Sequence, residues 1–233
     1  MKKKFCIFLI LFLVKFSGQE FKVLVLKDSI SENRDYQIFE FINDKTNLEN
    51  LKFLASVSCE GEKASFSNIY EVAKFKSQLL GANSFKFIKK EESESKIKIY
   101  LDIYYSDGNN LILNRNNEEE NRIFVFGSDN FNEKKKRLYK LNGKIQALQN
   151  REFDIINYKL GETIKIASKE FLSQPVVFKT YKNFKSIFLN TDGWGRTESN
   201  ESVKDYVIVK IITYELFYQF DKNLGYTLLE INK

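Results

Sequence analysis

Hydrophobic and polar residues alternate along most of this chain, and that pattern predicts a protein built largely of strands. Residues 96–105 (KIKIYLDIYY) and 51–59 (LKFLASVSC) show the period of two most clearly. One segment has a helical period instead. It opens at Asn68, whose spacing to Glu71 is that of a capping box, and it ends at Gly81, which suits a left-handed cap. The first part of the chain is therefore expected to be a small α/β sandwich with one main helix.

The second half of the chain is nearly all strand in its pattern. Residues 107–121 are polar and rich in turn-forming residues, which marks them as the expected boundary between two domains. Asn142-Gly143 stands between two alternating runs and predicts a type I′ hairpin. Asn223-Leu224-Gly225 is expected to be a turn. The strands expected in this half are residues 122–126, 137–141, 144–148, 152–158, 162–167, 176–181 and 186–189.

Together these patterns predict an α+β fold in two domains. Residues 19–108 form the small α/β sandwich, and residues 109–233 form an antiparallel, β-rich, sandwich-like domain.

The N-terminus has the layout of a secretory signal peptide, residues 1–18. Three lysines precede ten uncharged, mostly apolar residues at positions 5–14, and the small residues Ser17 and Gly18 follow. The apolar run is shorter than the ~20 residues that span a bilayer, so the mature chain is expected to have no spanning segment. We expect export to the periplasm or the cell exterior, with surface association possible in either case. Cleavage after Gly18 and retention as an N-terminal anchor both stay open.

Composition and charge exclude several classes of protein. The chain has 233 residues and no histidine, which excludes Ser–His–Asp triads and HExxH zinc helices. Its two cysteines are too few for a disulfide framework or a structural zinc cluster. The net charge of +6 owes four lysines to residues 1–18, so the mature chain holds 33 basic against 31 acidic residues. Neither a cofactor, a metal nor a nucleic-acid partner is expected.

Two places in the sequence could contact a partner. Trp194 and Arg196 lie in a glycine-containing loop, where an exposed indole could stack on a sugar or a protein. Lys134, Lys135 and Lys136 form the strongest basic run, which could contact an anionic polymer or membrane surface or could simply be a solvated turn.

Catalysis without histidine would need paired carboxylates. Asp102, Asp154 and Glu162 are the candidates nearest to expected strands, and nothing in the sequence brings them together. The one cysteine outside the signal, Cys59, is expected to be either a small buried residue or a reactive thiol that forms an intermolecular disulfide or has a redox role.

Two stretches resemble known bacterial families. Residues 77–85 (SQLLGANSF) are similar to the "A-x-x-L-G-A-N" helix-end motif of small envelope α/β domains, which include the Rcs-pathway sensor lipoprotein of the outer membrane. Residues 141–144 (LNGK) and 160–164 (LGETI) more loosely resemble the prealbumin-like β-sandwich modules of bacterial lipoproteins. The abundance of Lys, Asn, Ile and Phe resembles exported proteins of Bacteroidota. These resemblances imply folds and a location, and they name no active site.

The sequence thus favours an exported, non-catalytic protein of the cell envelope that has an interaction or structural role. Its expected partner is an envelope protein or polysaccharide. The alternatives are a carboxylate-based hydrolase acting on envelope glycans and an aromatic-lined module that binds glycans or proteins.

Overall fold

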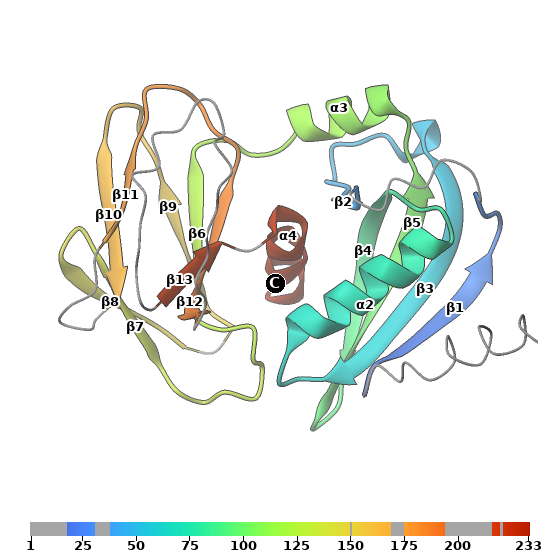
Figure 1. Cartoon of the computed structure of the whole chain (residues 1–233), viewed down its shortest axis with the longest axis horizontal. Helices are drawn as coiled ribbons and strands as arrows, with labels where there is room; N and C mark the ends of the chain where they lie inside the picture. Colours follow the sequence, from blue (N-terminus) through green and yellow to red (C-terminus); the bar gives the residue numbers. More distant parts are fainter. Residues whose placement is uncertain (1–17, 31–37, 150, 169–174, 194–215, 220) are drawn as a thin grey trace, which may run out of the picture.

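The computed structural model shows an α+β protein whose described residues form three sheets and three α-helices (Figure 1). The structure describes residues 18–30, 38–149, 151–168, 175–193, 216–219 and 221–233. The α+β fold class predicted from the alternating pattern is therefore confirmed. Within the described residues, no helix is long and apolar enough to cross a membrane.

The first part of the chain forms a five-stranded sheet in the order β1-β3-β5-β4-β2. All its pairs are antiparallel except β2–β4. The alternation in β5 puts isoleucine and leucine side chains on the covered face, where Ile97, Ile99 and Ile103 are completely buried. The strands are β1 (Glu20–Leu26), β2 (Glu40–Phe41), β3 (Lys52–Glu62), β4 (Ser84–Glu92) and β5 (Lys96–Tyr105), with a short 3₁₀ turn, η1 (Leu48–Asn50), before β3.

Helix α2 (Phe66–Leu79) covers that buried face, as the periodicity predicts. It begins at Ser65 and not at the expected capping residue Asn68, because apolar contacts extend the helix by one turn to the buried Phe66. Its end is as predicted. Gly81 has φ +90°, and the amides of Gly81 and Ala82 donate to the carbonyls of Gln78 and Ser77 in a Schellman arrangement.

The second part of the chain is a sandwich of two four-stranded sheets, ordered β11-β10-β7-β8 and β13-β12-β6-β9. The predicted hairpin at Asn142-Gly143 is confirmed, since both residues have positive φ and join β7 to β8. One pair, β6–β12, is parallel within these otherwise antiparallel sheets. The strands are β6 (Arg122–Phe126), β7 (Arg137–Leu141), β8 (Lys144–Leu148), β9 (Phe153–Asn157), β10 (Thr163–Ser168), β11 (Val176–Lys179), β12 (Ile187–Gly193) and β13 (Leu216–Gln219).

Strand β6 is buried on both faces and connects the two cores. Ile123 and Val125 pack inside the sandwich, whereas Phe124 and Phe126 face the opposite way into the core of the first sheet. A strand with a solvated face would carry polar residues at every second position, so this run of four apolar residues reflects the second layer that covers it.

That covering layer is α4 (Lys222–Ile231), which lies between the five-stranded sheet and β12 (Figure 1). The prediction of a turn at residues 223–225 is wrong, because these residues belong to α4. The Asp221 carboxylate accepts from the amides of Asn223 and Leu224 and starts a helix there. Gly225 allows close packing, because a Cβ at this position would lie 2.3 Å from the ring of Phe188.

The region predicted as a polar turn at residues 107–110 is also helical. The Asp107 side chain accepts from the amide of Asn110 and caps α3 (Gly108–Asn116). This short helix follows β5 and leads into the acidic residues 118–120 before β6. The expected domain boundary at residue 108 thus coincides with the start of a helix.

Candidate functional site: a basic surface where the sheets meet

The predicted basic run lies in the loop between β6 and β7. Lys134, Lys135 and Lys136 are exposed, and none of them has an ion-pair partner within the part of the chain that the structure describes. The loop itself is held by Phe131, which is buried and stacks on Phe66 at 5.4 Å between ring centres. The Phe131 amide also donates to the carbonyl of Lys63 at 2.8 Å, which anchors the loop beside the end of β3, three residues before the lysine run begins.

Three further cations converge on a single carboxylate next to this loop. Arg151 donates through both terminal nitrogens to the two oxygens of Glu92, at 2.8 and 2.7 Å. Lys63 Nζ lies 3.1 Å from one Glu92 oxygen, and Lys90 Nζ lies 3.5 Å from the other. The Arg151 guanidinium also lies over the ring of Phe131, 4.7 Å from its centre.

The pKa of Glu92 shows how strongly these cations act. Partial burial alone would raise it, yet hydrogen bonds and charge from Arg151 and Lys63 lower the pKa to about 2. Glu92 is therefore ionised at neutral pH and balances only one of its three cations. Together with the free lysine run, this leaves a local excess of positive charge. We call the six cations the basic surface: Lys63, Lys90, Lys134, Lys135, Lys136 and Arg151.

Of the acids beside the lysine run, Glu133 is balanced by a cation of its own, whereas Asp129 and Glu152 accept hydrogen bonds from neutral groups, which do not offset a carboxylate charge. Glu133 pairs with Arg137 at 2.8 Å, and Asp129 accepts from the hydroxyl of Ser67 at the start of α2. Glu152 accepts from the backbone amide of Gln149 at 2.6 Å.

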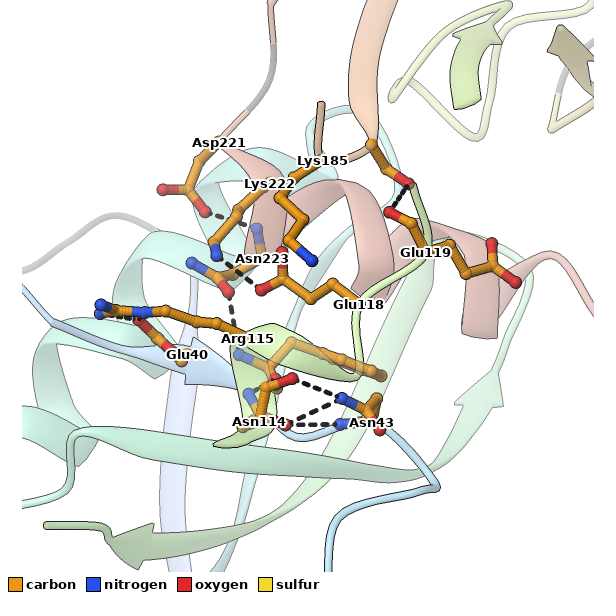
Figure 2. Close-up of polar contacts among 12 residues, drawn as sticks. Glu40, Asn43, Asn114, Arg115, Glu118, Glu119, Lys185, Asp221, Lys222 and Asn223 are labelled. Carbon is orange, nitrogen blue, oxygen red and sulfur yellow. Dashed lines mark hydrogen bonds and ion pairs between the residues drawn. The ribbon is translucent and has the colours of Figure 1, made fainter. Parts of the chain in front are cut away.

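A second polar network lies where α3, β2 and the start of α4 meet (Figure 2). Arg115 donates through Nε to Glu40 at 2.6 Å, and Lys222 donates to Glu118 at 2.6 Å. Both carboxylate side chains are only 7% exposed. Such buried charges are tolerated only when a cation is fixed beside them, so this network locks α3 and α4 against the first sheet.

Hydrogen bonds of asparagine side chains also join these segments. The Asn114 carbonyl oxygen accepts from Asn43 Nδ2 at 3.0 Å and from the hydroxyl of Thr46 at 2.8 Å. Asn223 at the start of α4 accepts from the amide of Phe41 in β2 at 2.9 Å (Figure 2). These contacts join segments that are distant in the sequence, although the second carboxylate oxygens of Glu40 and Glu118 are buried without a hydrogen-bond partner.

The candidate carboxylates for hydrolysis lie on separate elements with separate partners. Asp102 accepts from Ser56 on the five-stranded sheet, and Asp154 accepts from Tyr139 in the sandwich. Glu162 lies in the turn before β10, where its carboxylate accepts from the Lys159 amide. The described residues contain no group of three or more His, Cys, Asp or Glu side chains placed to hold a metal ion.

The sequence also predicted roles for Trp194, Arg196 and Cys59. Trp194 and Arg196 lie outside the described residues, as does the signal sequence up to residue 17. Cys59 is a free, fully buried thiol on β3, and burial raises its pKa to about 12. Of its two expected states, the structure has the buried one.

Half of the basic surface could not be found from sequence. Lys63 and Arg151 are isolated cations and Lys90 is the second of two consecutive lysines, each in a different segment. They become neighbours only through the pairing of β3, β4 and β5 and the packing of the β6–β7 loop on α2.

Comparisons with known proteins add little to this description of the site. No protein-family model and no curated protein matches the chain. Among solved structures, the crystal structure of a Francisella virulence factor, FvfA, is similar to this chain at 12% identity and a TM-score of 0.30. That match covers 38% of this chain and 99% of the other.

Proposed function

We propose that this chain is an exported, non-catalytic protein of the bacterial cell envelope that binds an anionic polysaccharide through its basic surface. The observation that supports this is the lysine run at positions 134–136, which is exposed and has no ion-pair partner among the described residues. Export rests on the layout of residues 1–18.

The loop exposes charged side chains and buries its aromatic side chain, and this combination favours a polysaccharide over a protein as the partner. Phe131, the aromatic residue of the loop, is only 5% exposed. Protein interfaces usually have apolar cores in which lysine is depleted. A row of lysines is better suited to a repeating line of sulfate, phosphate or carboxylate groups, each contact contributing ~1 kcal/mol near an anionic surface.

Binding to a soluble acidic polysaccharide such as heparin, used as a generic probe, tests the proposal. Changing Lys134, Lys135 and Lys136 together to Glu should weaken binding at least a hundredfold, as the loss of about 3 kcal/mol implies. The matched control changes Lys144, Lys159 and Lys165 to Glu. These lysines are exposed residues of the sandwich without ion pairs in the described structure, and the change in net charge is the same. Equal weakening in both variants would show that only the net charge matters and would overturn the proposal.

A further inference from the structure

Gln19 is the residue directly before strand β1, which begins at Glu20. The pairing of β1 with β3 begins at the next residue, Glu20, which lies opposite Glu60. The half-buried Gln19 side chain packs against Gly61, where a Cβ would come within 3.0 Å of its Cγ. Gly18 is exposed and has φ +102°, with nothing near its missing side chain. The Gly18–Gln19 peptide bond therefore lies at the accessible edge of the folded unit.

Neither the backbone amide nor the side-chain amide of Gln19 has a hydrogen-bond partner in the described chain. Gln19 helps to line a hollow of about 460 Å³ at the junction of β1, β3 and α2. The other lining residues are Gly18, Glu62, Ala64, Ser65 and Asn68. The reactive groups of this glutamine are thus ordered close to the sheet yet free of competing bonds.

The end of α2 that lines the hollow disfavours a positive charge beside it. The N-terminal end of α2 opens onto the hollow, and Ser65, its capping residue, makes no side-chain hydrogen bond to the helix. A helix N-terminus carries partial positive charge, which favours neutral or negative groups and hydrogen-bond acceptors. The negative charge of Glu62 would favour a positive charge in the hollow. Glu62 is exposed, however, and water and salt screen its charge.

We propose that cleavage after Gly18 leaves Gln19 as the first residue of the mature protein, and that Gln19 then cyclises to pyroglutamate. This inference rests on the export that forms part of the proposed function. In the step, the unprotonated α-amine nitrogen attacks Cδ of its own side-chain amide. A new C–N bond forms, the Cδ–Nε2 bond breaks, and Nε2 leaves as ammonia with a proton from the amine.

The reaction requires no other reactant, because both groups belong to one residue and the ring closure is intramolecular. An α-amine with an ordinary pKa of ~7.7–8.0 is partly unprotonated at neutral pH. The product is a neutral lactam whose carbonyl can accept hydrogen bonds at the open end of α2. Cyclisation thus removes the one charge that the mature terminus would place beside the helix.

Intact mass and N-terminal sequencing of the protein recovered from an expressing bacterium test this. The expected mass is that of residues 19–233 less one ammonia, with sequencing blocked until the pyroglutamate is removed enzymatically. A Gln19→Ser variant should show no ammonia loss and sequence directly. Finding residues 19–233 with an intact glutamine would overturn cyclisation and leave export standing. An uncleaved chain or a different terminus would overturn cleavage after Gly18 and with it the cyclisation, whereas the proposed polysaccharide binding would be unaffected.

Discussion

The guanidinium of Arg151 contacts both oxygens of Glu92, across 59 positions of the sequence. Arg151 adopts φ +66°, a left-handed conformation that is unfavourable for a residue with a side chain. The ion pair and the contact with the Phe131 ring offset that cost. The same contacts join the end of β4 to the sandwich and hold three cations together at one place, so structure and charge at the basic surface are linked.

Arg151→Met should destabilise the protein by about 1–3 kcal/mol, because it removes two charge-assisted hydrogen bonds to a partly buried carboxylate. Chemical denaturation at neutral pH measures this change. Arg122→Met is the control. It removes an exposed ion pair with Glu119 and should change the free energy of unfolding by less than about 0.5 kcal/mol.

The same pair predicts a dependence on pH. The pKa of Glu92 is lowered in the folded protein, so its stabilising effect is complete above its ordinary pKa of ~4.3 and is lost as the pH falls toward 2. The wild-type free energy of unfolding should therefore drop between about pH 5 and pH 2 more steeply than that of Arg151→Met. Parallel pH profiles would show that Arg151 does not lower this pKa.

Lys222→Met should cost about 3 kcal/mol or more, because it leaves the buried Glu118 carboxylate without its cation. Adding Glu118→Gln to this variant should recover part of the loss, since the second change removes the unpaired charge. Denaturant titration of the single and double variants gives the coupling between the two residues. Simple additivity would mean that the pair makes no contribution at this junction.

Gly225→Ala should destabilise the packing of α4, although alanine ordinarily favours a helix. The new methyl group would overlap the ring of Phe188, and overpacking of this kind costs typically ~1–3 kcal/mol. Gly108→Ala, in α3, has open space around the new methyl group and should be neutral or slightly stabilising. Thermal unfolding of both variants distinguishes the packing effect from helix propensity.

Cys59 should react with a thiol reagent at pH 8 only when the protein unfolds. Its side chain is fully buried and its pKa is raised to about 12, so the native protein presents almost no accessible thiolate. The labelling rate in increasing urea should follow the unfolded fraction. Rapid stoichiometric labelling of the native protein would contradict the buried position on β3.

Strand β5 was predictable because one of its faces contacts a core, and the alternation in residues 96–105 gives its bounds directly. The bounds of β6 follow from a run of four apolar residues, which reflects burial on both faces. The helix α4 was missed for a physical reason. Asn223-Leu224-Gly225 has the composition of a turn, but its helix depends on the Asp221 cap and on Phe188, a neighbour distant in sequence that fits only against glycine.

Of the basic surface, the sequence shows only the lysine run. Lys134–Lys136 are consecutive and visible as a charge run, whereas Lys63, Lys90 and Arg151 are brought to them by strand pairing and by the Phe131 anchor. Neither periodicity nor composition predicts that residues so far apart in the sequence lie close together in the fold.

The salt dependence of polysaccharide binding tests the central claim most directly. The logarithm of the binding constant should fall linearly with the logarithm of salt concentration, because bound lysines release counterions from the polymer. Replacing Lys134, Lys135 and Lys136 by Glu should make that slope smaller by about two to three, and replacing Lys144, Lys159 and Lys165 should leave it nearly unchanged. The same slope in wild-type protein and both variants, or no binding by the wild type at low salt, would contradict a polysaccharide site at the basic surface.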